Sequence, residues 1–323
     1  MDGHRSAGAL AAVEGEDTAF LADVIDGLSR PRKSLPCKYF YDREGSALFD
    51  AICGLDAYYP TRTETALLRG CAAAIAALAG PGAALIELGS GSSVKVRILL
   101  DALDSPALYV PVDISRDHLM DAAGRLAADY PSLTVVPVAA DYMRGFPLPR
   151  GVAPERAVAF FPGSTIGNLR PAEAQRFLLG LGRRLGAGSR LLIGVDLRKD
   201  PAVLEAAYDD PEGVTAAFNR NLLARINREL GGTFELSRFA HRARYDAARG
   251  RIEMHLESLE DQAVRIAGRR FRFAAGETIH TENSYKYSVP GFRRLAARAG
   301  WRDGRSWTDA EALFSLHWLV WGG

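Results

Sequence analysis

Apolar runs of strand length alternate with segments of helical period through the middle of the chain. The first run, in Ala83–Lys95, ends at Glu87 and is followed by a Gly-Ser-Gly turn at residues 89–91 before a helix-compatible stretch resumes at Val94–Leu103. This order predicts a buried strand, a tight turn and a helix start. Glycine suits the turn because a Cβ atom would obstruct its backbone and the close approach of a ligand. Backbone N–H groups at the helix start can then face a nucleotide cofactor.

Four further apolar runs predict the other strands of an open parallel sheet, namely Tyr109–Ser115, Leu133–Tyr142, Ala157–Pro162 and Arg190–Asp196. The first of these ends in Asp113 and the second in Asp141, at the carboxyl edge where open α/β sheets bind ligands. A carboxylate after the second strand can accept hydrogen bonds from both ribose hydroxyls, and one after the third can accept from an adenine amino group. The polar turn Gly163–Asn168 lies at the same edge, and a helix is predicted over Pro171–Leu185.

After Asp196 the α/β alternation stops. The pattern predicts a helix over Val214–Leu230 and antiparallel strands in Glu235–Tyr245, Arg251–Val264 and Arg270–Phe273. A helix over Pro290–Ala299 and strands over Trp301–Trp307 and Ala312–Trp321 then complete the first sheet with an antiparallel hairpin. The expected organisation is a disordered N-terminus (1–17), a nucleotide-cofactor domain (62–196 and 286–323) and a substrate-binding α+β domain (18–61 and 197–285).

The segment Leu35–Glu64 concentrates aromatic residues ahead of the glycine turn. Tyr39, Phe40 and Tyr59 are expected to pack in a flap, whereas Tyr41 and Tyr58 are expected to face a ligand.

Composition narrows the class of protein. The 323 residues carry a net charge of +1, which gives no general attraction to nucleic acid or anionic lipid. Three cysteines without C-x-x-C spacing indicate reduced packing residues, and the six histidines show no metal-ligand spacing. No segment has the length and apolar character of a membrane span. We therefore expect a cytoplasmic enzyme without a metal.

The glycine turn also fits other nucleotide-binding proteins. A nicotinamide-dependent oxidoreductase would place a third glycine at position 94, where this chain has Val94. A non-catalytic nucleotide-binding module would not require the polar turn and the aromatic segment to meet at one cleft. The three acidic strand ends, Glu87, Asp113 and Asp141, instead resemble the set found in the Rossmann-like fold of S-adenosylmethionine (SAM) methyltransferases.

Five motifs carry a closer resemblance: KYFYDREGSALFD, YYPTRTE, ELGSGSS, FFPGSTIGNL and HTENSYKYS. From about Leu35 to Trp321 the chain resembles the L-histidine Nα-methyltransferases of ergothioneine biosynthesis, a SAM-dependent amino-acid methyltransferase family. The resemblance implies a SAM methyltransferase sheet with an inserted α+β domain, and three successive methylations of histidine to give hercynine. Relatives that methylate other amino acids, such as tryptophan, remain the alternative.

The resemblance also implies site residues. Those for the cofactor are Gly89, Lys95, Asp113, Asp141 and Tyr142, where many relatives have Phe in place of Tyr142. Those for the amine and carboxylate of the substrate are Tyr58, Asn168 and Tyr208. Glu282 and Ser284 would receive the imidazole, Tyr41 and Met254 would line the pocket, and Tyr41 and Tyr58 would serve catalysis.

Simpler interpretations of four of these residues stay open. Lys95 can be a solvated helix residue, Asn168 can serve its own turn, and Tyr208 can face solvent in the loop before Pro211. Glu282 can form an ion pair with Lys286. The expected chemistry is methyl transfer to the neutral amine of a small molecule, and most of the acceleration should come from positioning and desolvation. We expect the enzyme to be a monomer with no nucleic-acid or membrane partner.

Overall fold

The computed structural model describes residues 18–91 and 94–323. The chain divides into two compact units, which we treat separately. Unit 1 comprises Met1–Ile52, Glu205–Tyr245 and Ile252–Glu282, and unit 2 comprises Cys53–Leu204, Asp246–Arg251 and Asn283–Gly323. Residues 1–17, which the sequence predicts to be disordered, and Ser92 and Ser93 of the glycine loop lie outside the described residues. The domains predicted from the sequence were defined by cofactor and substrate binding, whereas these units are defined by packing alone. The predicted domain limits therefore stay a prediction.

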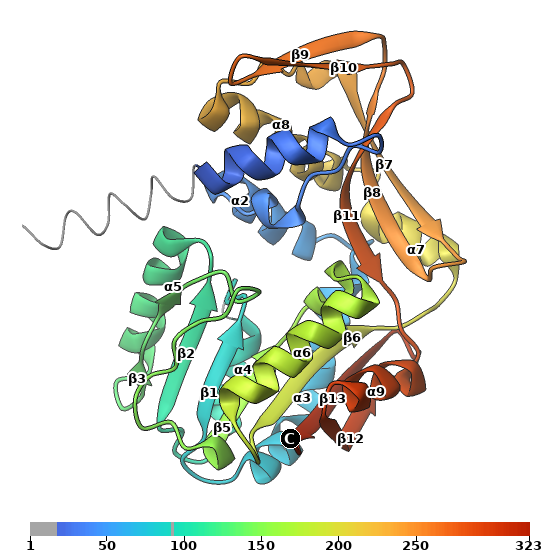
Figure 1. The fold of residues 1–323 in the computed structure, drawn as a ribbon. Helices are drawn as coiled ribbons and strands as arrows, with labels where there is room; N and C mark the ends of the chain where they lie inside the picture. Colours follow the sequence, from blue (N-terminus) through green and yellow to red (C-terminus); the bar gives the residue numbers. More distant parts are fainter. Residues whose placement is uncertain (1–17, 92–93) are drawn as a thin grey trace, which may run out of the picture. The chain divides into compact units, whose positions relative to one another are not determined.

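Unit 2 is built on an eight-stranded sheet with the order β12-β13-β6-β5-β1-β2-β3, in which β4 also pairs with β2 (Figure 1). Its strands are β1 Ala84–Leu88, β2 Leu108–Asp113, β3 Thr134–Val135, β4 Val138–Ala139, β5 Ala157–Phe161, β6 Arg190–Asp196, β12 Trp301–Thr308 and β13 Phe314–Trp321. Strands β1 to β6 pair in parallel, and the β12–β13 hairpin joins β6 antiparallel. The predicted Rossmann-like sheet with its closing hairpin is confirmed.

Helices cover both faces of this sheet, which explains why every residue of β1 and β5 is buried (Figure 1). Apolar side chains of α3, α4 and α5 pack with Leu85 in one core, and those of α6 and α9 pack with Ile86 in the other. Successive side chains of β1 point to opposite faces of the sheet, so the strand contributes apolar side chains to both cores. These helices are α3 Tyr59–Ala79, α4 Val94–Ala102, α5 Arg116–Asp129, α6 Pro171–Leu185 and α9 Val289–Arg298.

Three predicted elements were wrong in detail. The single strand expected over Leu133–Tyr142 is two short strands, because Pro137 has no N–H group to continue the ladder. The alternating run Arg251–Val264 contains two strands, and the segment before Val214 contains an unpredicted helix, α7 Pro201–Tyr208. The first residues of Glu235–Tyr245 form the 3₁₀ turn η4 Leu236–Arg238 rather than strand.

Unit 1 combines helices with small sheets. A three-stranded sheet has the order β11-β8-β7, and β9 and β10 form a separate antiparallel pair. Several of these elements run past the unit's limits, and their bounds are β7 Phe239–Asp246, β8 Arg251–Ser258, β9 Gln262–Ile266, β10 Arg269–Phe273 and β11 Thr278–Tyr285. The helical elements are a helix over 18–29, η1 Cys37–Phe40, α2 Arg43–Cys53 and α8 Val214–Leu230.

Candidate functional site

The turn after β1 brings two strand ends together. Gly89 has φ 78°, a conformation that glycine adopts without strain, and its N–H donates to Val112 O at 2.8 Å. A Cβ atom at Gly89 would stand 3.9 Å from the Tyr142 ring. Asp113 directly follows Val112 in the chain. Gly89, Asp113 and Tyr142, three residues predicted to hold the cofactor, therefore lie beside one another at the ends of β1, β2 and β4.

The carboxylate of Asp113 ends β2 and is partly committed to the backbone. It accepts from the Ser115 N–H at 2.8 Å. Burial raises the pKa of Asp113, although the N–H groups of Ser115 and Ser90 oppose the rise. Ser90 belongs to the glycine turn, so this carboxylate and the turn form one polar corner. A carboxylate has about four lone-pair positions, which leaves capacity for ribose hydroxyls.

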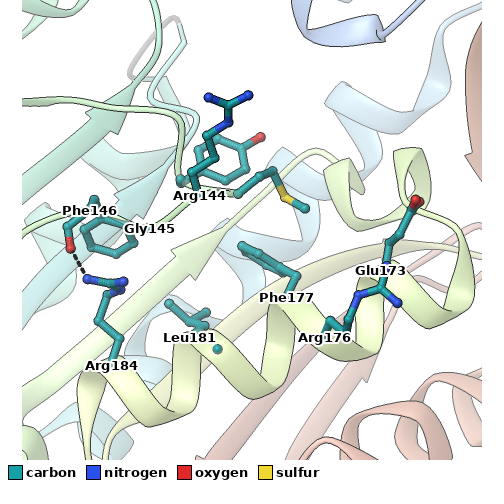
Figure 2. Close-up of a pocket in the computed structure, with 11 residues that line it drawn as sticks. Arg144, Gly145, Phe146, Glu173, Arg176, Phe177, Leu181 and Arg184 are labelled. Atoms are coloured by element: carbon teal, nitrogen blue, oxygen red, sulfur yellow. Dashed lines mark hydrogen bonds between the residues drawn. The ribbon is translucent and has the colours of Figure 1, made fainter.

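Tyr142 lies between this corner and a pocket of about 460 Å³. Its ring packs edge-on against Phe161 and Phe177, with centroids 5.7 and 6.0 Å away. Figure 2 shows the pocket between residues 142–146 and α6, where the Arg184 guanidinium donates to the Phe146 carbonyl oxygen. Asp141 accepts from the Met143 N–H at 3.0 Å, which shapes the start of this segment.

Lys95 of α4 is not a solvated helix residue. Its ammonium lies 2.5 Å from Glu64 of α3, a carboxylate with no exposed surface. Glu64 also accepts from the Gly163 N–H at 2.8 Å. The ion pair thus fixes the first residue of the turn after β5. A cofactor role for Lys95 stays a prediction.

A second buried carboxylate, Asp196, ends β6 and gathers three polar side chains. Both Lys199 and Lys286 place their ammonium groups 2.6 Å from it, and the Tyr59 hydroxyl donates to it at 2.8 Å. Lys199 also donates to the Tyr59 hydroxyl at 2.6 Å. We call these four residues the Asp196 cluster. Tyr59 is buried, in agreement with the packing role expected for it, and its hydroxyl also takes part in this cluster.

The Asp196 cluster reaches two of the predicted substrate residues in unit 2. Lys286 donates to the Ser284 hydroxyl at 2.8 Å. The Asp196 N–H donates to the hydroxyl of Ser164, which opens the turn η3 Thr165–Asn168 in a left-handed conformation with φ 56°. The predicted residue Asn168 ends that turn. Tyr58 precedes α3 and neighbours Tyr59 in the chain.

The remaining predicted residues belong to unit 1. Tyr41 packs edge-on against Phe49 and Phe218, at 5.6 and 5.8 Å. Tyr208 ends α7 and is buried rather than facing solvent in a loop. Met254 lies in β8, where its carbonyl accepts from the Thr281 hydroxyl at 3.1 Å, and Glu282 follows Thr281 in β11.

A buried imidazole holds the end of α7 in unit 1. The Asn219 amide donates to His241 Nδ1 at 2.8 Å, so His241 Nε2 carries the proton and donates to the Tyr208 carbonyl at 2.8 Å. Burial lowers the pKa of His241, which favours this neutral form. The backbone of Tyr208 is thereby fixed.

Residues 20–321 match the profile of a family described as histidine-specific, SAM-dependent methyltransferases. The chain belongs to this family. It is 43% identical to the histidine N-alpha-methyltransferase of Mycolicibacterium smegmatis over 96% of this chain and 97% of that protein. It is 43% identical to the protein of the same name from Mycobacterium tuberculosis, over 94% and 96% of the two chains. Ergothioneine biosynthesis protein 1 of Neurospora crassa is 32% identical over 92% of this chain and 34% of that protein.

As a member of this methyltransferase family, the enzyme uses SAM as its cofactor. The polar corner fits that group: the Gly89 turn permits close approach, and Asp113 and Tyr142 offer a carboxylate and a ring beside it. Sequence reasoning missed the roles of Glu64, Asp196 and Lys199. Glu64 and Tyr59 stand in the YYPTRTE motif, but nothing in its spacing indicates their buried partners.

Proposed function

We propose that this enzyme methylates the α-amino nitrogen of L-histidine three times in succession and yields hercynine, a step of ergothioneine biosynthesis. One observation carries the proposal: 43% identity, over nearly the whole of both chains, to two histidine N-alpha-methyltransferases. The family profile, which spans residues 20–321, agrees with this substrate.

SAM supplies a methyl group on a positively charged sulfur, which an amine lone pair can displace directly. The protein must therefore bind the amine in its neutral form and hold nitrogen, methyl carbon and sulfur in line. We assign cofactor binding to Gly89, Lys95, Asp113, Asp141 and Tyr142. Their common edge of the sheet in unit 2 supports this assignment.

Substrate binding is assigned to Tyr58, Asn168, Tyr208, Met254, Glu282 and Ser284, and catalysis to Tyr41 and Tyr58. Each methylation brings the nitrogen closer to a permanent cation. Tyrosine rings attract such a cation by about 0.5–2 kcal/mol, which suits repeated methylation.

We further propose that the enzyme is a cytoplasmic monomer whose partners are small molecules. Its net charge of +1 supports the absence of a nucleic-acid partner. No helix in residues 18–91 and 94–323 combines the length and apolar character needed to cross a bilayer.

The test is incubation with SAM and with each standard amino acid or histamine separately, followed by mass spectrometry of the products. Mono-, di- and trimethylated histidine should form in that order. Tryptophan and histamine, which lack the imidazole and the carboxylate respectively, are the critical comparisons. Preferential methylation of tryptophan, or of no amino acid, would overturn the proposal.

A further inference from the structure

The connection from β4 to β5 leaves one flank of α6 open. Parallel strands are usually joined through a helix that packs on the sheet. Here the one helical element in residues 140–156, all of which the structure describes, is the short 3₁₀ turn η2 Pro154–Arg156. Residues 142–146 run beside α6 instead, and a pocket of about 460 Å³ lies between them (Figure 2). We call it the α6 pocket, and its volume suits a small organic molecule.

One face of α6 forms a wall of the α6 pocket. The lining residues of the helix are spaced at i, i+3, i+4, i+7, i+8 and i+11, which is the repeat of a single helical face. They are Glu173, Arg176, Phe177, Gly180, Leu181 and Arg184. The middle of this face is apolar, because Phe177 and Leu181 stand there, and its ends are charged. Figure 2 shows Arg176 and Arg184 at opposite ends, which lie about 12 Å apart along the helix at 1.5 Å per residue.

The arginines that line the α6 pocket differ in their ion pairs. Arg144 lies 3.7 Å from the carboxylate of Asp141. Arg176 stands close enough to the carboxylate of Glu173 for their charges to interact. Arg184, by contrast, has no ion-pair partner in the part of the chain that the structure describes. The pocket wall therefore carries an excess of positive charge, and Arg184 is the cation left to bind an anion.

The loop beside α6 holds Arg184 in place. Its guanidinium donates to the Phe146 carbonyl oxygen and lies 5.4 Å from the centre of the Phe146 ring. Gly145 permits this contact, because its φ is 99° and a Cβ atom there would stand 2.2 Å from Arg184 Nη2. A guanidinium has five N–H donors in a planar fork that matches carboxylate and phosphate groups. The bond to one carbonyl thus leaves donors for an anionic ligand.

We propose that the α6 pocket is a second ligand site, which takes a small organic anion with a planar apolar body. The anionic group pairs with Arg184, and the apolar body lies against Phe177 and Leu181. It also covers Met143, an apolar residue of the pocket that is 43% exposed. Among the described residues that we assign to the cofactor, Tyr142 alone lines this pocket. SAM itself carries a positively charged sulfur, which the excess of arginine disfavours here.

The experiment uses a fluorescent anion and its neutral counterpart. The anion is 8-anilinonaphthalene-1-sulfonate, and N-phenyl-1-naphthylamine is the same skeleton without the sulfonate. Each is titrated into enzyme saturated with SAM, so that the cofactor site is filled. We expect one site per chain for the anion, and Arg184→Gln should weaken the anion about fivefold while leaving the neutral probe unchanged. Arg183→Gln is the matched control, because Arg183 is an exposed neighbour on α6 outside the pocket lining.

A second variant fills the α6 pocket. A Cβ atom at Gly180 would meet no described atom within 4 Å, so a larger side chain enters the pocket without displacing its walls. Leucine also favours a helix more than glycine does, so Gly180→Leu is expected to fold. It should weaken both probes about tenfold or more, while the SAM affinity measured by calorimetry stays unchanged. Gly124→Leu in α5 is the control, since Gly124 is equally open.

Three results would overturn the inference. Arg184→Gln and Arg183→Gln could weaken the anion equally, which would indicate only a general effect of charge. Binding of both probes could survive in Gly180→Leu, which would place them elsewhere on the protein. Displacement of the anion by SAM from enzyme without cofactor would assign the binding to the cofactor site. No arm measures methyl transfer, so the inference can fail or hold independently of the proposed function.

Discussion

Glu87 of β1, two residues before the Gly89 turn, offers a sharp test of how burial changes the pKa of a carboxyl group near the assigned cofactor site. Its carboxyl group is buried and accepts from the Tyr109 hydroxyl at 2.5 Å. Burial raises the pKa of Glu87 to about 7, although the hydrogen bond from Tyr109 and the charge of Lys95 act to lower it. The folded protein therefore holds this carboxyl group largely protonated in mild acid.

The consequence for stability has a definite sign. Between the ordinary pKa of 4.5 and about 7, the folded state binds a proton that the unfolded chain has released. The stabilisation of the folded state that this proton provides is fully present below about pH 4.5, and it is lost as the pH rises through 7. At 1.36 kcal/mol for each pKa unit, the loss amounts to about 3 kcal/mol. That is a large share of the 5–15 kcal/mol typical of a folded protein.

Glu87→Gln keeps the shape and an oxygen acceptor for Tyr109 but cannot ionise. We expect the variant to gain about 3 kcal/mol relative to wild type between about pH 5 and pH 8, measured by urea unfolding. Asp101→Asn is the matched control, because Asp101 also accepts from a tyrosine, Tyr130, at 2.6 Å but is exposed. A free-energy difference between Glu87→Gln and wild type that stays constant over this pH range would refute the reasoning.

Three further predictions concern the assigned site. Asp113→Ala should weaken SAM binding by about 1.5–3 kcal/mol in calorimetry, whereas Asp101→Ala should not, and unchanged affinity would remove Asp113 from the cofactor site. Asn168→Ala and Tyr208→Phe should each raise KM for histidine with little change in SAM affinity, and efficient methylation of histamine by the wild-type enzyme would contradict this carboxylate clamp. Glu282→Ala should lower kcat/KM for histidine by about 2 kcal/mol and shift preference toward tryptophan, so a variant with the parental ranking would exclude Glu282 as the imidazole ligand.

The sheet of unit 2 was predictable because its signals are local. Apolar runs such as Arg190–Asp196 are buried on both faces, so their length and boundaries appear directly in the sequence. Helix α6 spans Pro171–Leu185 as predicted, with Pro171 in its first turn. The strand over Leu133–Tyr142 failed for an equally local reason, since Pro137 interrupts it and the pattern of apolar residues alone does not show where pairing stops.

The site was only partly predictable, because much of it depends on partners far apart in the chain. The Gly89 turn and Asp113 stand at strand ends, where topology alone brings them together. Glu64 and Asp196 are charged residues whose partners are distant in sequence, such as Lys286 for Asp196. No periodicity encodes such a pairing, and a lysine is ordinarily expected to be solvated.

Two residues with buried, ion-paired carboxylates contact the glycine-containing turn that ends in Asn168, a residue that we assign to the substrate. Glu64 accepts from the N–H of Gly163, and the next residue, Ser164, accepts from the N–H of Asp196. The start of the turn that ends in Asn168 is therefore held by the carboxylate of Glu64 on one side and by the backbone N–H of Asp196 on the other. Removing one partner of such a pair leaves an uncompensated charge, at a cost of about 3–5 kcal/mol. The start of this turn thus depends on residues of α3 and β6, and the carboxylates of both residues are held by ion pairs of their own.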